Sequence, residues 1–348
     1  MVKARIAGVA TAVPPYKVDQ ETIVRVAPLV FGPSFTDFQR LLPVFANTQV
    51  RTRYFARPVD WFLSPHTFQE SNGIYLETAF ELSNRAAEAV MTESGVSPGE
   101  IGMVVFASTS GIATPSLDSK LIQTLGLCRN IPRLPVWGLG CAAGVAGLAR
   151  AAEIAPQLGG RYLLFVTVEL CSLTFQLRDL SKANVVATSL FGDGAAAVLI
   201  GTRAEGPELL ASYSHLWDNS EDIMGWEMVE TGFKVRLSRD IPSLVRTEMP
   251  ALLDASAAAW GISRSDIHHY VIHPGGAKVL EAFAQTTGIN PAALDHSYHV
   301  LREYGNMSSP TVLFALKHLL DTTPPADELG LMLAFGPGFS AEQVLFRW

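Results

Sequence analysis

The stretch PVWGLGCAAGVAGLAR, residues 135–150, carries no charge before Arg150 and nothing larger than leucine after Trp137. It begins as a short apolar run and continues as an alanine-rich, helix-forming run, with Cys141 at the changeover. A helix that is apolar all round belongs in the interior of a large domain rather than on its surface. Cys141 would lie in the first turn, where unpaired N–H groups and the helix dipole favour a thiolate. The stretch alone leaves two interpretations open, a catalytic nucleophile or a small buried hydrophobe, which is what most free cysteines are.

The composition describes a globular protein with a thick interior. The 348 residues are 48% hydrophobic and 17% charged, which gives room for two core-bearing units or one large pseudo-symmetric one. A net charge of −7 provides no basic field that would attract nucleic acid or a membrane surface. Three scattered cysteines argue against a disulfide framework or a zinc site. Because we also find no signal peptide and no apolar run of about 20 residues, we expect a cytoplasmic protein without a membrane span, metal or cofactor.

Buried, strand-like runs alternate with helical patterns along the whole chain. Residues 101–108 and 161–170 are two such runs, and each lies between helix-forming segments. This alternation predicts an α/β layered fold.

The second half of the sequence repeats the first. GVSPGEI at 95–101 is echoed by GISRSDI at 261–267, a shift of 166, and a shift of 165 places Gly305-Asn306 on Gly140-Cys141. Two copies of one unit, packed face to face, would bury both central helices and bring the turns at Cys141 and Asn306 close together. We therefore predict two pseudo-symmetric halves, residues 1–208 and 209–348.

Three polar residues occupy special places in this scheme. Cys141 starts a buried helix, His273 ends a buried strand, and Asn306 lies just before another helix. Acyl transfer through a thioester uses this set: a thiolate attacks, an imidazolium keeps the thiolate ionised, and His and Asn N–H groups stabilise charge on a carbonyl oxygen. Any one of them alone could be structural, but the three together favour a catalytic site.

Over nearly its whole length the sequence resembles the type III polyketide synthases, the chalcone synthase superfamily, which have the thiolase-like αβαβα fold. The resemblance rests on motifs in a specific order, namely Gly138-Leu139-Gly140-Cys141, Leu190-Phe191-Gly192-Asp193-Gly194-Ala195, His273-Pro274-Gly275-Gly276, Tyr304-Gly305-Asn306-Met307-Ser308-Ser309 and Phe335-Gly336-Pro337-Gly338.

The resemblance implies roles for individual residues. Cys141 would carry the growing chain, while His273 and Asn306 would promote decarboxylation of malonyl-CoA and the Claisen condensation. Phe191 matches a phenylalanine that gates the junction between the CoA tunnel and the cavity. Six more residues match positions that line the cavity: Thr109, Cys171, Thr174, Trp226, Val235 and Ser308. The family is homodimeric, and its CoA thioesters are substrates rather than cofactors.

Departures from the plant pattern indicate the substrate. Cys171 replaces a usual threonine, Val235 stands in place of a second gating phenylalanine, and Trp226 stands at a glycine position. The pattern is most similar to the bacterial branch that makes alkylpyrones or alkylresorcinols from fatty acyl starters. We therefore expect medium or long fatty acyl-CoA starters, decarboxylative condensation with malonyl-CoA, and closure to an alkylpyrone.

Several alternatives remain open at this stage. The same residues would serve alkylresorcinol or other aromatic polyketide formation. They would also serve a ketoacyl synthase III-like enzyme that makes one condensation with acyl carrier protein. A Cys-His-Asn hydrolase would need water at the acyl-enzyme, which the apolar setting of Cys141 opposes. Arg40, Arg51 and Arg53 belong to a basic cluster that is either a solvated face or a rim that meets CoA phosphates.

Overall fold

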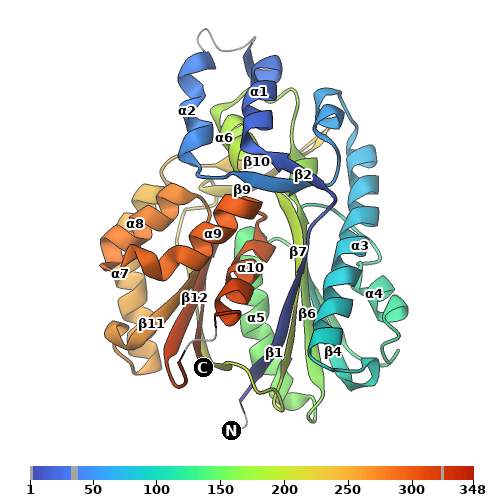
Figure 1. Cartoon of the computed structure of the whole chain (residues 1–348), viewed down its shortest axis with the longest axis vertical. Helices are drawn as coiled ribbons and strands as arrows, with labels where there is room; N and C mark the ends of the chain where they lie inside the picture. The colour runs from blue at the N-terminus through green and yellow to red at the C-terminus, as the bar shows by residue number, and fades with distance from the viewer. Residues whose placement is uncertain (1–2, 33–37, 323–324) are drawn as a thin grey trace.

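Two groups of strands meet edge to edge in one nine-stranded sheet (Figure 1). The computed structural model describes residues 3–32, 38–322 and 325–348. The first group, in spatial order, is β5 (Arg133–Val136), β4 (Ile101–Ala107), β6 (Tyr162–Leu170), β7 (Asp193–Gly201) and β1 (Arg5–Ala12). The second is β8 (Glu208–Leu216), β13 (Ser340–Arg347), β12 (Leu329–Gly336) and β11 (Ile267–Ile272). The groups pair at Arg5 and Glu208.

The two groups have the same pairing pattern. The parallel pair β4–β6 corresponds to β11–β12, and the antiparallel pairs β6–β7 and β7–β1 correspond to β12–β13 and β13–β8. The repeated sequence is therefore a repeated structure. β7 ends at Gly201 and β8 begins at Glu208, so the division that we predict after residue 208 lies at the start of β8.

The turns that lead into β4 and β11 are also equivalent. Each is a short 3-10 helix, η4 (Pro98–Glu100) or η8 (Arg264–Asp266). Each begins with a capping box, in which a serine and an acidic residue three positions later satisfy each other's backbone N–H groups. The matching heptapeptides of the sequence are these turns.

Two buried helices lie between the two groups of strands. α5 (Ala143–Ile154) and α10 (Ser309–Leu320) are both 12 residues long, and most of their residues are buried, as the apolar sequence predicts. A Cβ atom on Gly144 would lie 2.3 Å from the carbonyl oxygen of Ser309, so only glycine allows the two helices to approach this closely.

Further helices cover the outer faces of the sheet. α3 (Phe68–Glu93) and α4 (Asp118–Thr124) pack on the first group of strands. α7 (Ile241–Trp260) and α8 (Ala277–Thr287) pack on the second group. α9 (Asp295–Tyr304) follows in the chain and packs mainly against α10. The result is the layered αβαβα arrangement that we expect, with α5 and α10 as the central layer (Figure 1).

A cap of short elements lies over one end of the sheet, at the top of Figure 1. It comprises β2 (Tyr16–Asp19), α1 (Gln20–Phe31), η2 (Phe38–Leu41), α2 (Pro43–Asn47), β3 (Thr52–Phe55), η3 (Val59–Leu63), η7 (Cys171–Thr174), α6 (Lys182–Leu190) and the hairpin of β9 (Met224–Val229) and β10 (Gly232–Leu237). α1 buries Ile23, Ala27 and Phe31, one turn apart, against the rest of the cap. Within the described ranges, no helix is long and apolar enough to cross a membrane.

Candidate active site

Cys141 lies one turn before the central helix rather than in it. The residue belongs to the 3-10 turn η5 (Gly140–Ala142), and α5 begins at Ala143. Gly140 has φ of 47°, and a Cβ atom there would lie 2.9 Å from the ring of Pro337. The turn therefore requires glycine directly before the cysteine. The backbone N–H of Gly140 donates to the Thr109 hydroxyl at 3.3 Å, which holds the turn from behind.

His273 follows β11, and both of its ring nitrogen atoms are buried. Its backbone N–H donates to the carbonyl of Leu333 at 2.8 Å, which continues the pairing with β12. The side chain is 2% exposed, and neither Nδ1 nor Nε2 has a hydrogen-bond partner among the described residues. Since buried polar atoms in proteins nearly always have partners, these two are expected to bind a substrate or water.

Asn306 is fixed through its backbone and its side chain. Its N–H donates to the carbonyl of Leu190 at 2.9 Å, and its carbonyl accepts from the N–H of Gly192 at 2.9 Å. Side-chain Oδ1 accepts from the Ser308 N–H at 2.7 Å, so Nδ2 must be the donor; it lies 3.3 Å from the Gly275 carbonyl. That bond uses one of the two Nδ2 hydrogens. The other is available to a ligand.

Ser308 has φ of 58°, which is unusual for a residue other than glycine. It precedes α10 in the N-cap position. The hydrogen bond from the Ser308 N–H to the Asn306 side-chain oxygen helps to hold this conformation.

The structure brings the three predicted catalytic residues into one cavity of about 300 Å³, here termed the reaction cavity. Four of the other predicted residues also line it: Phe191, Trp226, Val235 and Ser308.

A second, smaller space of about 80 Å³, the apolar chamber, adjoins the first. Cys171 and Thr174 line it together with a row of α1 side chains, Ile23, Val26, Ala27, Val30 and Phe31. Phe191, Trp226 and Val235 line both spaces and form the partition between them. The rings of Phe191 and Trp226 lie 6.2 Å apart.

Thr109 lines neither space, which corrects its expected place in the cavity wall. It is 4% exposed and lies behind the Cys141 turn. Its N–H donates to Glu169, a buried carboxylate at the end of β6 that also accepts from the Ser110 N–H and the Ser309 hydroxyl. Burial raises the pKa of Glu169. Sequence reasoning missed this residue, although a lone acid in the apolar run YLLFVTVEL was a usable signal.

Desolvation sets the protonation of the cysteine and the histidine. Burial raises the pKa of Cys141 to about 11, with a small opposing effect of the hydrogen bond with Ser308. Burial also lowers the pKa of His273 to about 3. Both shifts favour the neutral thiol and the neutral imidazole over the thiolate–imidazolium pair that the sequence suggests, because each charged form loses hydration on burial.

Arg53 is not part of a CoA rim. It is fully buried, and its guanidinium donates to the carbonyls of Thr188, Ser189 and Phe191 and to the side chain of Gln20. These carbonyls end α6, where helix geometry leaves C=O groups without partners. Burial lowers the pKa of Arg53 to about 9.

The other two predicted rim residues, Arg40 and Arg51, are exposed and line neither space. The basic residues that do line the reaction cavity are Arg236, Arg239 and Lys278. Local sequence patterns do not mark these three, because only the fold brings Lys278 to the same cavity as Arg236 and Arg239.

Comparison with known proteins identifies the family. Residues 2–204 match the N-terminal domain of chalcone and stilbene synthases, and residues 208–348 match the C-terminal domain. The 1,3,6,8-tetrahydroxynaphthalene synthase of Streptomyces peucetius subsp. caesius is 36% identical, over 99% of this chain and 93% of the relative. The alpha-pyrone synthesis polyketide synthase-like Pks18 of Mycobacterium tuberculosis (strain H37Rv) is 30% identical, over 99% of this chain and 91% of the relative.

A solved structure agrees. The crystal structure of 1,3,6,8-tetrahydroxynaphthalene synthase from Streptomyces coelicolor A3(2), a bacterial type III polyketide synthase, superposes with a TM-score of 0.94 at 29% identity and covers 99% of both chains. The chain therefore belongs to the chalcone and stilbene synthase family. It is a type III polyketide synthase, that is, a condensing acyltransferase.

Proposed function

We propose that this enzyme condenses a medium or long fatty acyl-CoA starter with malonyl-CoA on Cys141 and closes the product to an alkylpyrone. The observation that carries the proposal is the apolar chamber next to the reaction cavity, lined by aliphatic and aromatic side chains of α1. A flexible alkyl chain that enters it from Cys141 would gain up to about 0.8 kcal/mol for each buried methylene.

The chemistry starts from the neutral pair. As the acyl thioester arrives, His273 takes the Cys141 proton, Sγ bonds to the acyl carbon, and CoA leaves as a thiol with that proton. Because the proton passes from Cys141 to His273 and then to the departing CoA, no thiolate has to exist on its own in an apolar space.

Malonyl-CoA then loses CO₂. The resulting enolate oxygen accepts hydrogen bonds from a ring N–H of neutral His273 and from Asn306 Nδ2, and its carbon attacks the acyl-Cys141 carbonyl. The bond between that carbonyl carbon and Cys141 Sγ then breaks, the product leaves as a β-ketoacyl-CoA, and Sγ takes up a proton from water to restore the thiol. The unpaired nitrogens of His273 and the free amide N–H of Asn306 support the role of both residues as donors. Donors placed before the reaction stabilise such an oxyanion without the cost of reorganising water.

The CoA phosphates would lie against Arg236, Arg239 and Lys278. Lys278 and Arg239 are exposed at the same cavity that holds Cys141, whereas Arg236 is partly engaged by Asp222 at 3.3 Å. Replacing Arg239 and Lys278 together by alanine should raise KM for acyl-CoA and malonyl-CoA alike, with kcat nearly kept. Arg51→Ala, outside the cavity, is the matched control.

We also propose a cytoplasmic homodimer. Three free cysteines, one of them the exposed Cys128, suit a reducing compartment. Trp137 is 60% exposed beside the edge strand β5, and such a surface suits contact with a second copy. Light scattering at micromolar concentration should give twice the chain mass; a monomer mass would contradict the proposal.

The decisive experiment is product analysis by mass spectrometry with malonyl-CoA and starters from acetyl- to palmitoyl-CoA, plus coumaroyl-CoA. We expect kcat/KM to rise with alkyl length and alkylpyrones to accumulate. A better result with coumaroyl-CoA than with any fatty starter would contradict the alkyl assignment. Formation of alkylresorcinols or naphthalenes would support the proposed condensation and contradict the proposed pyrone cyclisation. A strict need for acyl carrier protein and a diketide product would indicate a ketoacyl synthase III-like reaction.

A further inference from the structure

The β9–β10 hairpin has one apolar face and one polar face. Trp226 and Val235, two members of the partition, are directly paired across the hairpin, so both project to the same side. Neighbours on that side are also apolar, whereas the alternate positions hold Glu227, Lys234 and Arg236. The hairpin is a separate two-stranded sheet. Since such a hairpin is at best marginally stable alone, its position depends on what holds it.

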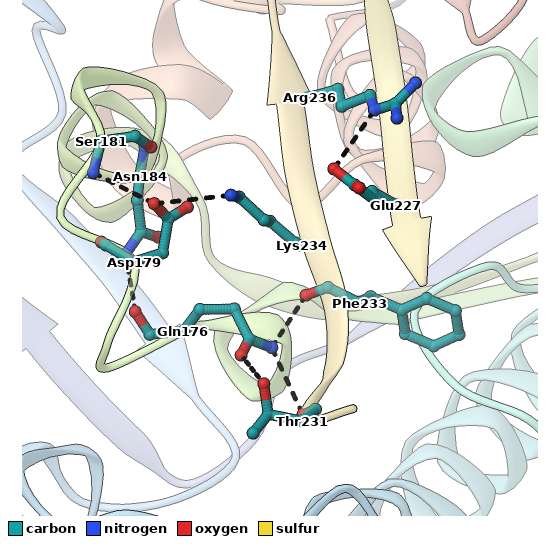
Figure 2. Close-up of polar contacts among 9 residues, drawn as sticks. All are labelled: Gln176, Asp179, Ser181, Asn184, Glu227, Thr231, Phe233, Lys234 and Arg236. Atoms are coloured by element: carbon teal, nitrogen blue, oxygen red, sulfur yellow. Dashed lines mark hydrogen bonds and ion pairs between the residues drawn. The ribbon is translucent and has the colours of Figure 1, made fainter. Parts of the chain in front are cut away.

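One side chain, Gln176, holds the turn end of this hairpin (Figure 2). Its Nε2 donates to the carbonyl of Phe233 at 3.0 Å and lies 3.4 Å from the carbonyl of Thr231. Its Oε1 accepts from the Thr231 hydroxyl at 2.5 Å. Both ends of the amide therefore bond to the hairpin, from a side chain that is 9% exposed.

The segment that carries Gln176 is itself part of the apolar chamber. Thr174 and Phe175 line the chamber directly before Gln176. The carbonyl of Gln176 accepts from Asn184 Nδ2 at 2.9 Å, and the same Nδ2 donates to the Asp179 carbonyl at 2.7 Å (Figure 2). Asn184 belongs to α6, the helix that Phe191 directly follows. Gln176 thus connects the wall that bears Phe191 with the hairpin that bears Trp226 and Val235.

We propose that Gln176 is a positioning residue that sets the opening between the reaction cavity and the apolar chamber, and so controls which starter lengths the enzyme accepts. The inference rests on the proposed function, because it assumes that the alkyl chain of the starter passes through the partition. Without the Gln176 side-chain amide, the β9–β10 hairpin loses its fixed position. Each starter that passes between Trp226 and Phe191 must then fix the hairpin as it binds, which costs binding free energy. A starter too short to reach the partition avoids that cost.

A nearby ion pair offers a matched control. Lys234, between Phe233 and Val235 on the same strand, lies 3.9 Å from Asp179 in the same loop as Gln176. The Lys234 side chain is 39% exposed and its ammonium lies 3.9 Å from the Oδ1 of Asp179, which is 9% exposed and also accepts from the Ser181 N–H at 3.1 Å. The ion pair is long and its cation is screened by water, so it contributes little. Lys234→Met therefore disturbs the same two segments without removing the buried amide.

The test compares kcat/KM for starters from acetyl- to lauroyl-CoA in the wild type, Gln176→Leu, Gln176→Glu and Lys234→Met. Both Gln176 variants should lower the ratio of lauroyl to acetyl activity by about tenfold, the effect of losing one or two buried hydrogen bonds. Acetyl activity, malonyl-CoA decarboxylation and Cys141 alkylation should stay within about twofold of the wild type, because none of them requires the partition. Lys234→Met should leave the ratio unchanged.

An equal loss for all starters, or an unchanged ratio, would overturn the inference. If Gln176→Leu fails to fold, Thr231→Val removes only the hydroxyl bond and should shift the ratio the same way by a smaller factor. The wild-type profile tests the proposed function separately. A wild type that prefers small or aromatic starters would refute the alkyl assignment, while a variant effect that still depends on starter size would uphold the role of Gln176.

Discussion

The two spaces on either side of the partition differ in how their polar groups are satisfied. In the reaction cavity neither ring nitrogen of His273 has a partner among the residues that the structure describes, and Ser308 has a strained backbone conformation. In the apolar chamber the polar groups are already paired: the Thr174 hydroxyl donates to the Cys171 carbonyl at 2.8 Å, and Ser172 N–H donates to Asp193 at 2.7 Å. We therefore propose that the reaction cavity carries out the chemistry and that the apolar chamber selects the starter. Each prediction below tests whether the separation holds.

Loss of the nucleophile should have the largest effect. Cys141→Ala should abolish condensation with every starter, since no other thiol lines the reaction cavity in the described part of the chain. Mass spectrometry after incubation with acyl-CoA should find the wild-type adduct on Cys141. Cys128→Ala, at an exposed site, is the control and should keep full activity. An adduct on Cys171 would place the chemistry in the apolar chamber instead of the reaction cavity.

Removal of the amide donor should come next. Asn306→Ala should reduce malonyl-CoA decarboxylation by about 100-fold or more, the usual cost of losing one oxyanion donor. The profile of relative starter preference should stay as in the wild type, because the partition is unchanged. A change of preference without loss of decarboxylation would reverse the roles that we assign to the two spaces.

The protonation of Cys141 gives a pH test. Because burial raises its pKa to about 11, alkylation by iodoacetamide should increase about tenfold per pH unit between pH 7 and 9, following the thiolate fraction. The rate constant should show no plateau in this range. A plateau beginning near pH 6 or 7 would show that the thiolate–imidazolium pair forms after all. The same measurement on His273→Gln shows whether the histidine affects alkylation of Cys141. A rate equal to that of the wild type would exclude a contribution of His273 to the ionisation of the thiol.

Filling the partition should have the smallest effect on chemistry and a clear effect on selection. Val235→Phe should lower kcat/KM for lauroyl-CoA by about tenfold, because a phenyl ring would overpack the opening to the apolar chamber. Acetyl-CoA activity and malonyl-CoA decarboxylation should stay within about twofold. Val229→Phe, elsewhere on the hairpin, is the control. Equal losses for acetyl and lauroyl starters would mean that the alkyl chain does not pass this position.

The layered fold could be predicted because its strands are continuous apolar runs and its two halves share equivalent turns. The three residues in the reaction cavity were predictable for the same reason, since each follows or precedes a recognisable buried element. The apolar chamber was not. About half of its lining residues belong to short elements between residues 16 and 63, and the rest belong to residues 171–191 and the β9–β10 hairpin, so no single local pattern marks it.

Local sequence patterns do not report desolvation, and two residues show its effect. Arg53 belongs to a run of arginines and looks like a surface residue, yet it binds the carbonyls at the end of α6 in the interior. The helix start at Cys141 suggests a thiolate, yet burial favours the thiol. Both outcomes depend on how much water the finished fold excludes.

The pair of backbone bonds between Asn306 and the segment around Phe191 has a consequence for redesign. The Asn306 backbone donates to Leu190 and accepts from Gly192, so Phe191 and the Asn306 side-chain amide are carried on one bridge between the two halves. A mutation that moves the backbone at Phe191 would therefore also move the amide to which we assign the oxyanion role. Trp226 and Val235 belong to a hairpin that, among the described residues, has no such bridge to Asn306. An engineer who wants a new starter without a slower enzyme should alter the hairpin and leave Phe191 in place.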